Sequence, residues 1–196
     1  MSKIMGYTEL KAVMEEKLPE KRFLHSLGVA ETAAMLARRF NLDIDGALIC
    51  GIYHDAYRYI GKEEALKEVE EYGISIFKEE RENGNLLHAP IAAYHMREDV
   101  GPVPSAYVKA VRYHTLGSRD MGRLGAAIYI ADYSEPGRKH LDDREREHIY
   151  SFESLEGMVR YIIERQNEYF QREGLRNAEV TDDLYSFLVA GGCFED

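Results

Sequence analysis

The chain of 196 residues has little cysteine, little proline and no apolar run near the roughly 18 residues that a membrane-spanning helix needs. Cys50 and Cys193 form no CxxC pair, which argues against a disulfide scaffold or a cysteine-bound zinc and fits a reducing compartment. The first residues also lack the uninterrupted apolar segment of a secretory signal. These absences lead us to expect a cytoplasmic protein that has no membrane partner.

The chain also has fewer basic than acidic residues. The 25 lysines and arginines face 35 aspartates and glutamates, which gives a formal net charge of −10. A field of this sign repels polyanions, so we expect no nucleic acid partner. A small phosphorylated substrate remains compatible with the composition, because a bound cation and a few arginines reverse the sign of a single pocket.

Strand-type alternation is scarce as well, and apolar residues recur instead at the three- and four-residue spacing of helices. The pattern predicts an all-α chain, and neither a repeat nor a long linker divides it, so we expect a single domain over residues 1–196. The expected helices cover about 7–18, 21–40, a segment capped by Asp43 or Asp45 and ending in GIYHDAYRYI, 62–72, 85–100 with Asn85 as its cap, a segment from Pro104 to near His114, 123–133, 142–150, 154–172 and 182–189.

The chemistry lies in the histidines and in two aspartates that follow apolar segments. His54 and Asp55 come directly after the apolar stretch 47–53. Consecutive residues of a helix diverge by about 100°, so this pair converges on one site only near a helix end or against other ligands. Asp132 follows the apolar run 126–131, where a carboxylate is costly unless it is paired or bound to metal.

Further histidines stand at the ends of expected helices. His88 falls in the first turn of its helix and His114 in the last turn of its own, while His25 lies within the second helix. Imidazole and carboxylate ligands together suit iron or manganese, or zinc. The pattern therefore predicts a metal site assembled from several helices.

Five ordered blocks carry a family resemblance, and they span roughly residues 20–140: RFLHSLGVAETAAMLA, ALICGIYHDAYR, NLLHAPIAAY, VRYHTLG and IYIADYSEPGR. The order His, His-Asp, His, His, Asp resembles the HD superfamily of metal-dependent phosphohydrolases. The flanking residues are similar to its YqeK-type symmetrical diadenosine tetraphosphate hydrolases. The resemblance implies an all-α HD-domain bundle with extra C-terminal helices and an iron centre of one or two ions, where manganese or another divalent metal is an alternative. It also implies symmetrical cleavage of the dinucleotide to two ADP by a water that the metal activates.

The resemblance also assigns roles to individual residues. The principal metal would be held by His25, His54, Asp55 and Asp132, and the last three would be the catalytic residues. Two further residues, His88 and His114, would bind a second metal bridged by Asp55 or would contact the phosphates. The nucleotide phosphates or their surroundings would be contacted by Arg22, Arg58, Tyr133 and Arg138.

Two positions depart from the family pattern. Arg58 stands where the family has lysine, which keeps the charge but offers a bidentate fork with a different reach. Gly125 and Ala126 stand where the family tends to carry a lysine shortly before the final aspartate, so affinity or specificity would differ if that lysine touches substrate.

Other readings of the same residues stay open. The chain could be another HD-family nucleotide phosphohydrolase, such as a nucleotidase or a guanosine tetraphosphate hydrolase, or a non-catalytic nucleotide or metal sensor. We expect a structural or peripheral role for His95, and solvated positions for His140 and His148 in their charged segments. An exposed apolar helix face would allow a homodimer, although no segment demands one.

Overall fold

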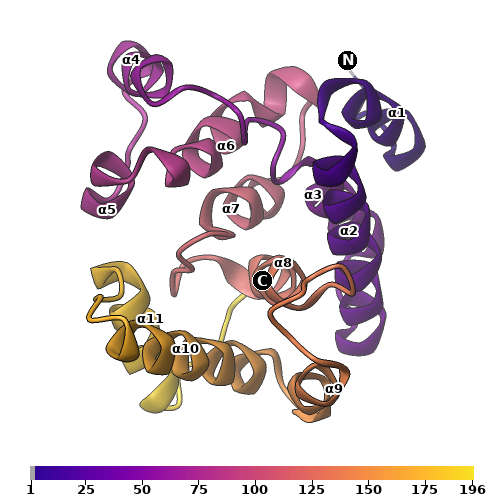
Figure 1. Ribbon diagram of the computed structural model, residues 1–196. Helices are drawn as coiled ribbons and strands as arrows, with labels where there is room; N and C mark the ends of the chain where they lie inside the picture. Colours follow the sequence, from indigo (N-terminus) through magenta and orange to yellow (C-terminus); the bar gives the residue numbers. More distant parts are fainter. Residues whose placement is uncertain (1–2) are drawn as a thin grey trace.

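The structure, a computed structural model, describes residues 3–196 and is all-helical over that range (Figure 1). This confirms the all-α prediction. The helices are α1 (Tyr7–Lys17), α2 (Glu20–Phe40), α3 (Ile44–Tyr53), α4 (Lys62–Tyr72), α5 (Lys78–Glu82), the 3-10 helix η1 (Gly84–Leu86), α6 (His88–Asp99), α7 (Ser105–Tyr113), α8 (Gly122–Ser134), α9 (Asp143–Ser151), α10 (Leu155–Arg172) and α11 (Glu179–Val189).

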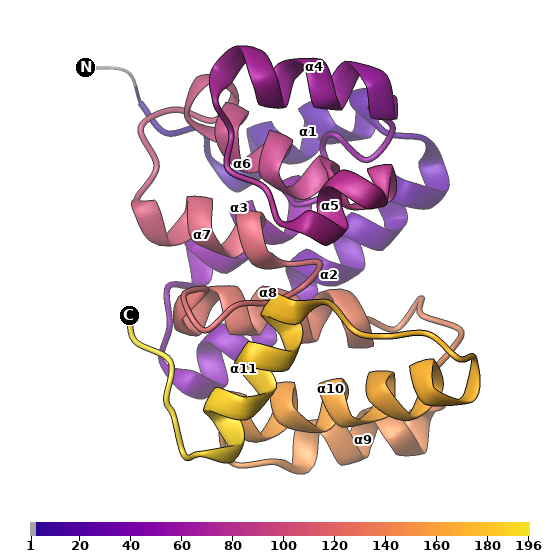
Figure 2. The same cartoon turned by 90° about the vertical axis from the view of Figure 1, so that its left-hand side faces the viewer.

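Helix α8 lies between two hydrophobic clusters. One cluster is formed mainly by α1, α2, α3, α6 and α7, and the other by α9, α10, α11 and one face of α8. Figure 2 shows α4 to α6 at one end of the molecule and α9 to α11 at the other, with α7 and α8 between them. Since α8 is buried on nearly every side, its sequence is almost continuously apolar up to Asp132. None of the helices in the described residues has the length and hydropathy to span a bilayer.

The expected helix ends agree with the observed ones to within about three residues, with three exceptions. The third helix was expected to end in GIYHDAYRYI, but α3 ends at Tyr53, because the backbone then forms turns with three-residue hydrogen bonds, such as that from the Ala56 N–H to the Tyr53 carbonyl. Asn85 does not cap α6, because the 3-10 turn Gly84–Leu86 comes first and the Asn83 side chain accepts from the backbone N–H of Asn85. The short helix α5 was not predicted. It is held by a long-range contact in which buried Glu80 pairs with Arg112 of α7 at 2.6 Å.

Helices α2 and α3 cross in backbone contact. A Cβ atom added to Gly51 of α3 would lie 2.5 Å from the Cα atom of Ala30 in α2, closer than any real contact. The absence of a side chain at Gly51 therefore sets the distance between the two helices. It also sets the distance between His25, on α2, and the residues that follow α3.

We expect Gly51→Ala to lower the free energy of unfolding by about 1–3 kcal/mol, the usual cost of overpacking a filled core. Because α3 must move away from α2, the variant should also bind divalent metal less tightly. Urea unfolding and a metal-binding titration measure the two effects. Gly61→Ala is the matched control, since a Cβ at Gly61 meets no atom within 4 Å. An unchanged midpoint for Gly51→Ala would contradict the packing argument.

Candidate metal centre

Six residues that the sequence singled out converge where five helices meet. Each of these residues belongs to a different helix or directly follows one, except that the adjacent pair His54 and Asp55 both follow α3. The residues are His25 in α2, His54 and Asp55 directly after α3, His88 at the start of α6, His114 directly after α7 and Asp132 in the last turns of α8. Helix α3 ends at Tyr53, so His54 and Asp55 lie at a helix end, where adjacent residues can face one centre.

Four of these residues form a first group, defined by short distances between ring nitrogens and carboxylate oxygens. The Nε2 atom of His25 lies 3.0 Å from Oδ1 of Asp132 and 3.7 Å from Oδ2 of Asp55. The Nε2 atom of His54 lies 3.3 Å from the same Asp55 oxygen and 3.7 Å from the same Asp132 oxygen. Two imidazoles and two carboxylates therefore present their donor atoms to one small volume.

A second group shares Asp55 with the first. The other oxygen of that carboxylate, Oδ1, lies 3.0 Å from Nε2 of His88 and 3.9 Å from Nε2 of His114. The two histidine Nε2 atoms are 3.1 Å apart. Asp55 thus directs one oxygen to each group, which is the arrangement of a bridging carboxylate.

The four histidines of the two groups have the same tautomer, because each Nδ1 atom faces an oxygen that can only accept a hydrogen bond. Nδ1 must then carry the proton, and Nε2 presents its lone pair to the centre. The acceptors are the Glu135 carboxylate for His25 (3.0 Å), the Gly51 carbonyl for His54 (2.7 Å), the Asn85 carbonyl for His88 (2.8 Å) and the Val111 carbonyl for His114 (2.7 Å).

The protonation states also suit metal ligands. Burial, together with the neighbouring His54 and His88, lowers the pKa of His114 to about 3, so its imidazole is neutral at pH 7. Burial alone would raise the pKa of Asp55, but contacts with His54 and His88 hold it well below the ordinary range, so the group is a carboxylate.

One orphaned atom gives an independent test of fit. Nε2 of His54 is fully buried and finds no hydrogen-bond partner among the described residues. An unpaired buried polar atom is costly unless something binds it. Imidazoles and carboxylates that converge in this way fit a divalent metal ion, and suit iron, manganese or zinc.

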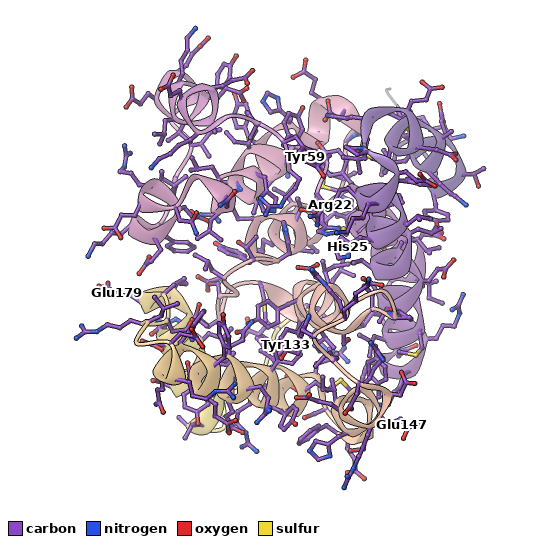
Figure 3. All side chains as sticks on the ribbon, viewed as in Figure 1. Arg22, His25, Tyr59, Tyr133, Glu147 and Glu179 are labelled. Atoms are coloured by element: carbon purple, nitrogen blue, oxygen red, sulfur yellow. The ribbon has the colours of Figure 1, made fainter. Side chains whose placement is uncertain are left out.

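Two of the predicted arginines lie against the carboxylates of the first group. Arg22 donates to Oδ2 of Asp55 at 2.7 Å, and Arg138 forms a salt bridge with Asp132. Figure 3 shows Tyr59, Arg22 and His25 in succession beside α2. Two guanidinium groups therefore place positive charge beside the carboxylates of the first group.

The other two residues with an expected substrate contact lie differently. Arg58 donates to the Asn85 carbonyl at 3.0 Å, the carbonyl that also accepts from His88. Tyr133 turns to the opposite side of α8, where it packs on the second hydrophobic cluster and its ring meets that of His140 (Figure 3). Arg58 thus stays next to the second group, while Tyr133 packs away from both groups.

The remaining histidines lie outside the cluster. His95 bonds to Glu68 of α4 at 2.7 Å and stacks on Tyr57, which fits the peripheral role expected for it. His140 and His148 are exposed, as predicted.

Glu135 is the residue of the site that the sequence argument did not single out. Its carboxylate is buried, accepts from Nδ1 of His25 and also accepts from the backbone N–H of Gly137 at 2.5 Å. It passes so close to α2 that a Cβ on Gly28 would lie 2.6 Å from its Oε2 atom. The signal was present as a carboxylate three residues after Asp132, but its partner lies 110 residues earlier in the chain.

Comparison with known proteins agrees with this geometry. The HD domain family matches residues 22–137. A Staphylococcus aureus protein named symmetrical bis(5'-nucleosyl)-tetraphosphatase is 35% identical over 165 residues, which cover 82% of this chain and 83% of the relative. A Bacillus subtilis protein of the same name is 36% identical over 134 residues, covering 68% of this chain and 72% of the relative.

One solved structure matches almost the whole fold. It is a Clostridium acetobutylicum protein described as a predicted HD superfamily hydrolase involved in NAD metabolism. The TM-score is 0.86 at 26% sequence identity, with 96% of this chain and all of the other covered. The helical fold and the histidine–aspartate cluster define a metal-binding protein of the hydrolase type. The chain belongs to the HD domain family.

Proposed function

We propose that the chain hydrolyses diadenosine tetraphosphate symmetrically to two ADP. The observation that carries the proposal is the convergence of four imidazole Nε2 atoms on the Asp55 and Asp132 carboxylates, with two arginines beside them. The relatives from Staphylococcus aureus and Bacillus subtilis that bear the name of this activity support it over most of the chain.

The residue roles form part of the same proposal. His25, His54, Asp55 and Asp132 would hold the principal metal, and His88 and His114, together with Asp55, would hold a second ion. We propose iron as the native metal, while manganese also suits this ligand set. A bound divalent ion lowers the pKa of a water ligand and neutralises charge on phosphate oxygens.

The chain's own residues then bind and orient the polyphosphate. Each arginine carries five N–H donors, so Arg22 and Arg138 retain free donors for phosphate after pairing with their aspartates. Arg58 extends this positive charge toward His88. Phosphoryl transfer depends mainly on positioning and on neutralising the nonbridging oxygens, and these residues supply both. Asp55 or Asp132 orients the attacking water.

We further propose a single HD domain over residues 1–196, with its core at about 20–140 and the C-terminal helices packed on it. The packing of α10 on α8 supports this view.

A homodimer is also proposed, supported by the exposed and stacked rings of Tyr72 and Tyr94. Light scattering after size exclusion would test it. The free cysteines Cys50 and Cys193 support a place in the reducing cytoplasm.

Product analysis tests the proposed activity. The purified protein, supplied with ferrous or manganese ions, is incubated with diadenosine tetraphosphate, and the nucleotides are separated by anion exchange. ADP as the sole product is expected. ATP plus AMP would contradict symmetrical cleavage. No turnover by metal-loaded protein would contradict the activity and favour another nucleotide substrate, such as guanosine tetraphosphate, or a non-catalytic sensor.

A further inference from the structure

A groove of about 1050 Å³ begins at the first metal group and runs between α2 and the loop that follows α8. His25 lies in its wall, and so do Arg22 and Arg138, the two arginines paired with Asp55 and Asp132. A groove of this volume is large enough for a nucleotide.

The groove is lined by more basic than acidic side chains, although the chain as a whole carries a net charge of −10. Lys21 and Lys139 line it together with the two arginines. These four cationic side chains outnumber the three glutamates of the lining, Glu20, Glu31 and Glu135, and the two arginines lie beside the metal group. This balance suits the phosphates of an anionic ligand rather than a neutral one.

The groove also holds apolar side chains that are unusually exposed. Tyr59 is 62% exposed and Leu24 is 56% exposed, and both residues line the groove. Tyr59 is the most exposed of the large hydrophobic residues in the described chain. Figure 3 shows Tyr59 next to Arg22, which in turn lies next to His25. The flat ring of Tyr59 therefore lies at one end of a row of side chains that continues through the Arg22 guanidinium to His25 of the metal group.

We infer that this groove is the subsite for one nucleoside diphosphate half of the substrate, an inference that rests on the proposed function. The base lies against Tyr59 and Leu24, and the phosphates lie against Arg22 and Arg138. Stacking on an aromatic side chain tolerates any base, because every base has a π face. The subsite accordingly recognises nucleotides by stacking and charge, with little choice between bases.

Binding of ADP to the manganese-loaded protein, measured by calorimetry, tests the subsite without depending on turnover. Tyr59→Ala should raise the dissociation constant for ADP by about ten-fold, as expected for loss of one stacking contact. Leu24→Ala should raise it by a smaller factor, because leucine offers apolar contact to the base but no stacking. The dissociation constant for pyrophosphate, which has no base, should stay the same. The controls are Tyr169→Ala and Leu175→Ala, which replace residues that are 50% and 56% exposed outside the groove, and these variants should bind ADP normally.

Two results would overturn the inference. One is ADP binding that is unchanged, or changed no more than pyrophosphate binding, in both groove variants. The other is metal-loaded protein that binds no ADP at all. The result of this binding test does not depend on whether the protein has the proposed activity. If the protein fails to cleave diadenosine tetraphosphate but its ADP affinity depends on Tyr59 and Leu24, the activity is wrong and the subsite stands.

Discussion

Asp55→Asn is expected to lower the turnover of diadenosine tetraphosphate roughly a thousand-fold or more. The carboxylate faces both sets of histidines, with Oδ2 toward His25 and His54 and Oδ1 toward His88. Asparagine keeps the shape but removes the charge. A bound metal supplies several kcal/mol of charge stabilisation, and about 4 kcal/mol corresponds to roughly a thousand-fold in rate.

The metal content of the same variant should fall in parallel, because both groups lose a ligand. Asp99→Asn is the matched control. Asp99 also lies in a partly buried position, where it accepts hydrogen bonds from Tyr53 and Tyr57, but it is outside the cluster. The control should keep its metal and most of its turnover. More than a tenth of the wild-type rate in Asp55→Asn would show that the bridge is not needed.

Glu135→Ala is expected to weaken metal binding by about 10–100-fold, the usual effect of removing a partner that orients a ligand. Burial alone would raise the pKa of Glu135, but hydrogen bonds from His25 and Gly137 lower it, so the residue is a carboxylate at neutral pH. Without it, the Nδ1 proton of His25 has no acceptor and the ring loses its fixed orientation. Glu135→Gln should fall between wild type and Glu135→Ala, since an amide oxygen still accepts but carries no charge.

Gly28→Ala tests the same contact from the other side. The added methyl group would lie 2.6 Å from Oε2 of Glu135 and must displace it, so metal binding should weaken although no ligand has changed. Glu147→Ala removes an exposed glutamate that Figure 3 shows far from the site, and it serves as the control. Competition with a coloured chelator measures each affinity. Equal affinities for wild type and Glu135→Ala would rule out a positioning role.

Local patterns predicted most of the helices, because helix formation here follows apolar periodicity and end signals. The same logic left open, for His54 and Asp55, either a helix end or convergence against other ligands, and the structure shows the helix end. It failed at Asn85, where the Asn83 side chain and a 3-10 turn compete with capping, and at α5, where a contact with Arg112 outweighs the lack of apolar residues. Both failures come from interactions that a short window does not contain.

The site was predictable in part for a similar reason. Asp132 was singled out because a carboxylate after an apolar run needs a partner, and His25 was assigned through the resemblance to the HD family. Glu135 was missed because its role depends on a histidine distant in sequence, and the direction of Tyr133 depends on how α8 packs between two clusters. The type and order of residues in the sequence indicate which of them are ligands. The direction in which each side chain points is known only once the packing of the helices is known.

We propose that the histidine–aspartate cluster binds metal and that the metal-loaded protein hydrolyses diadenosine tetraphosphate. The most direct test strips the protein with a chelator, adds back ferrous ions in steps without oxygen, and measures bound iron and ADP release on the same samples. We predict no ADP release without metal, a rise in step with bound iron, and neither binding nor turnover in Asp55→Asn. Full turnover by metal-free protein, or turnover unchanged as bound iron increases, would contradict the account.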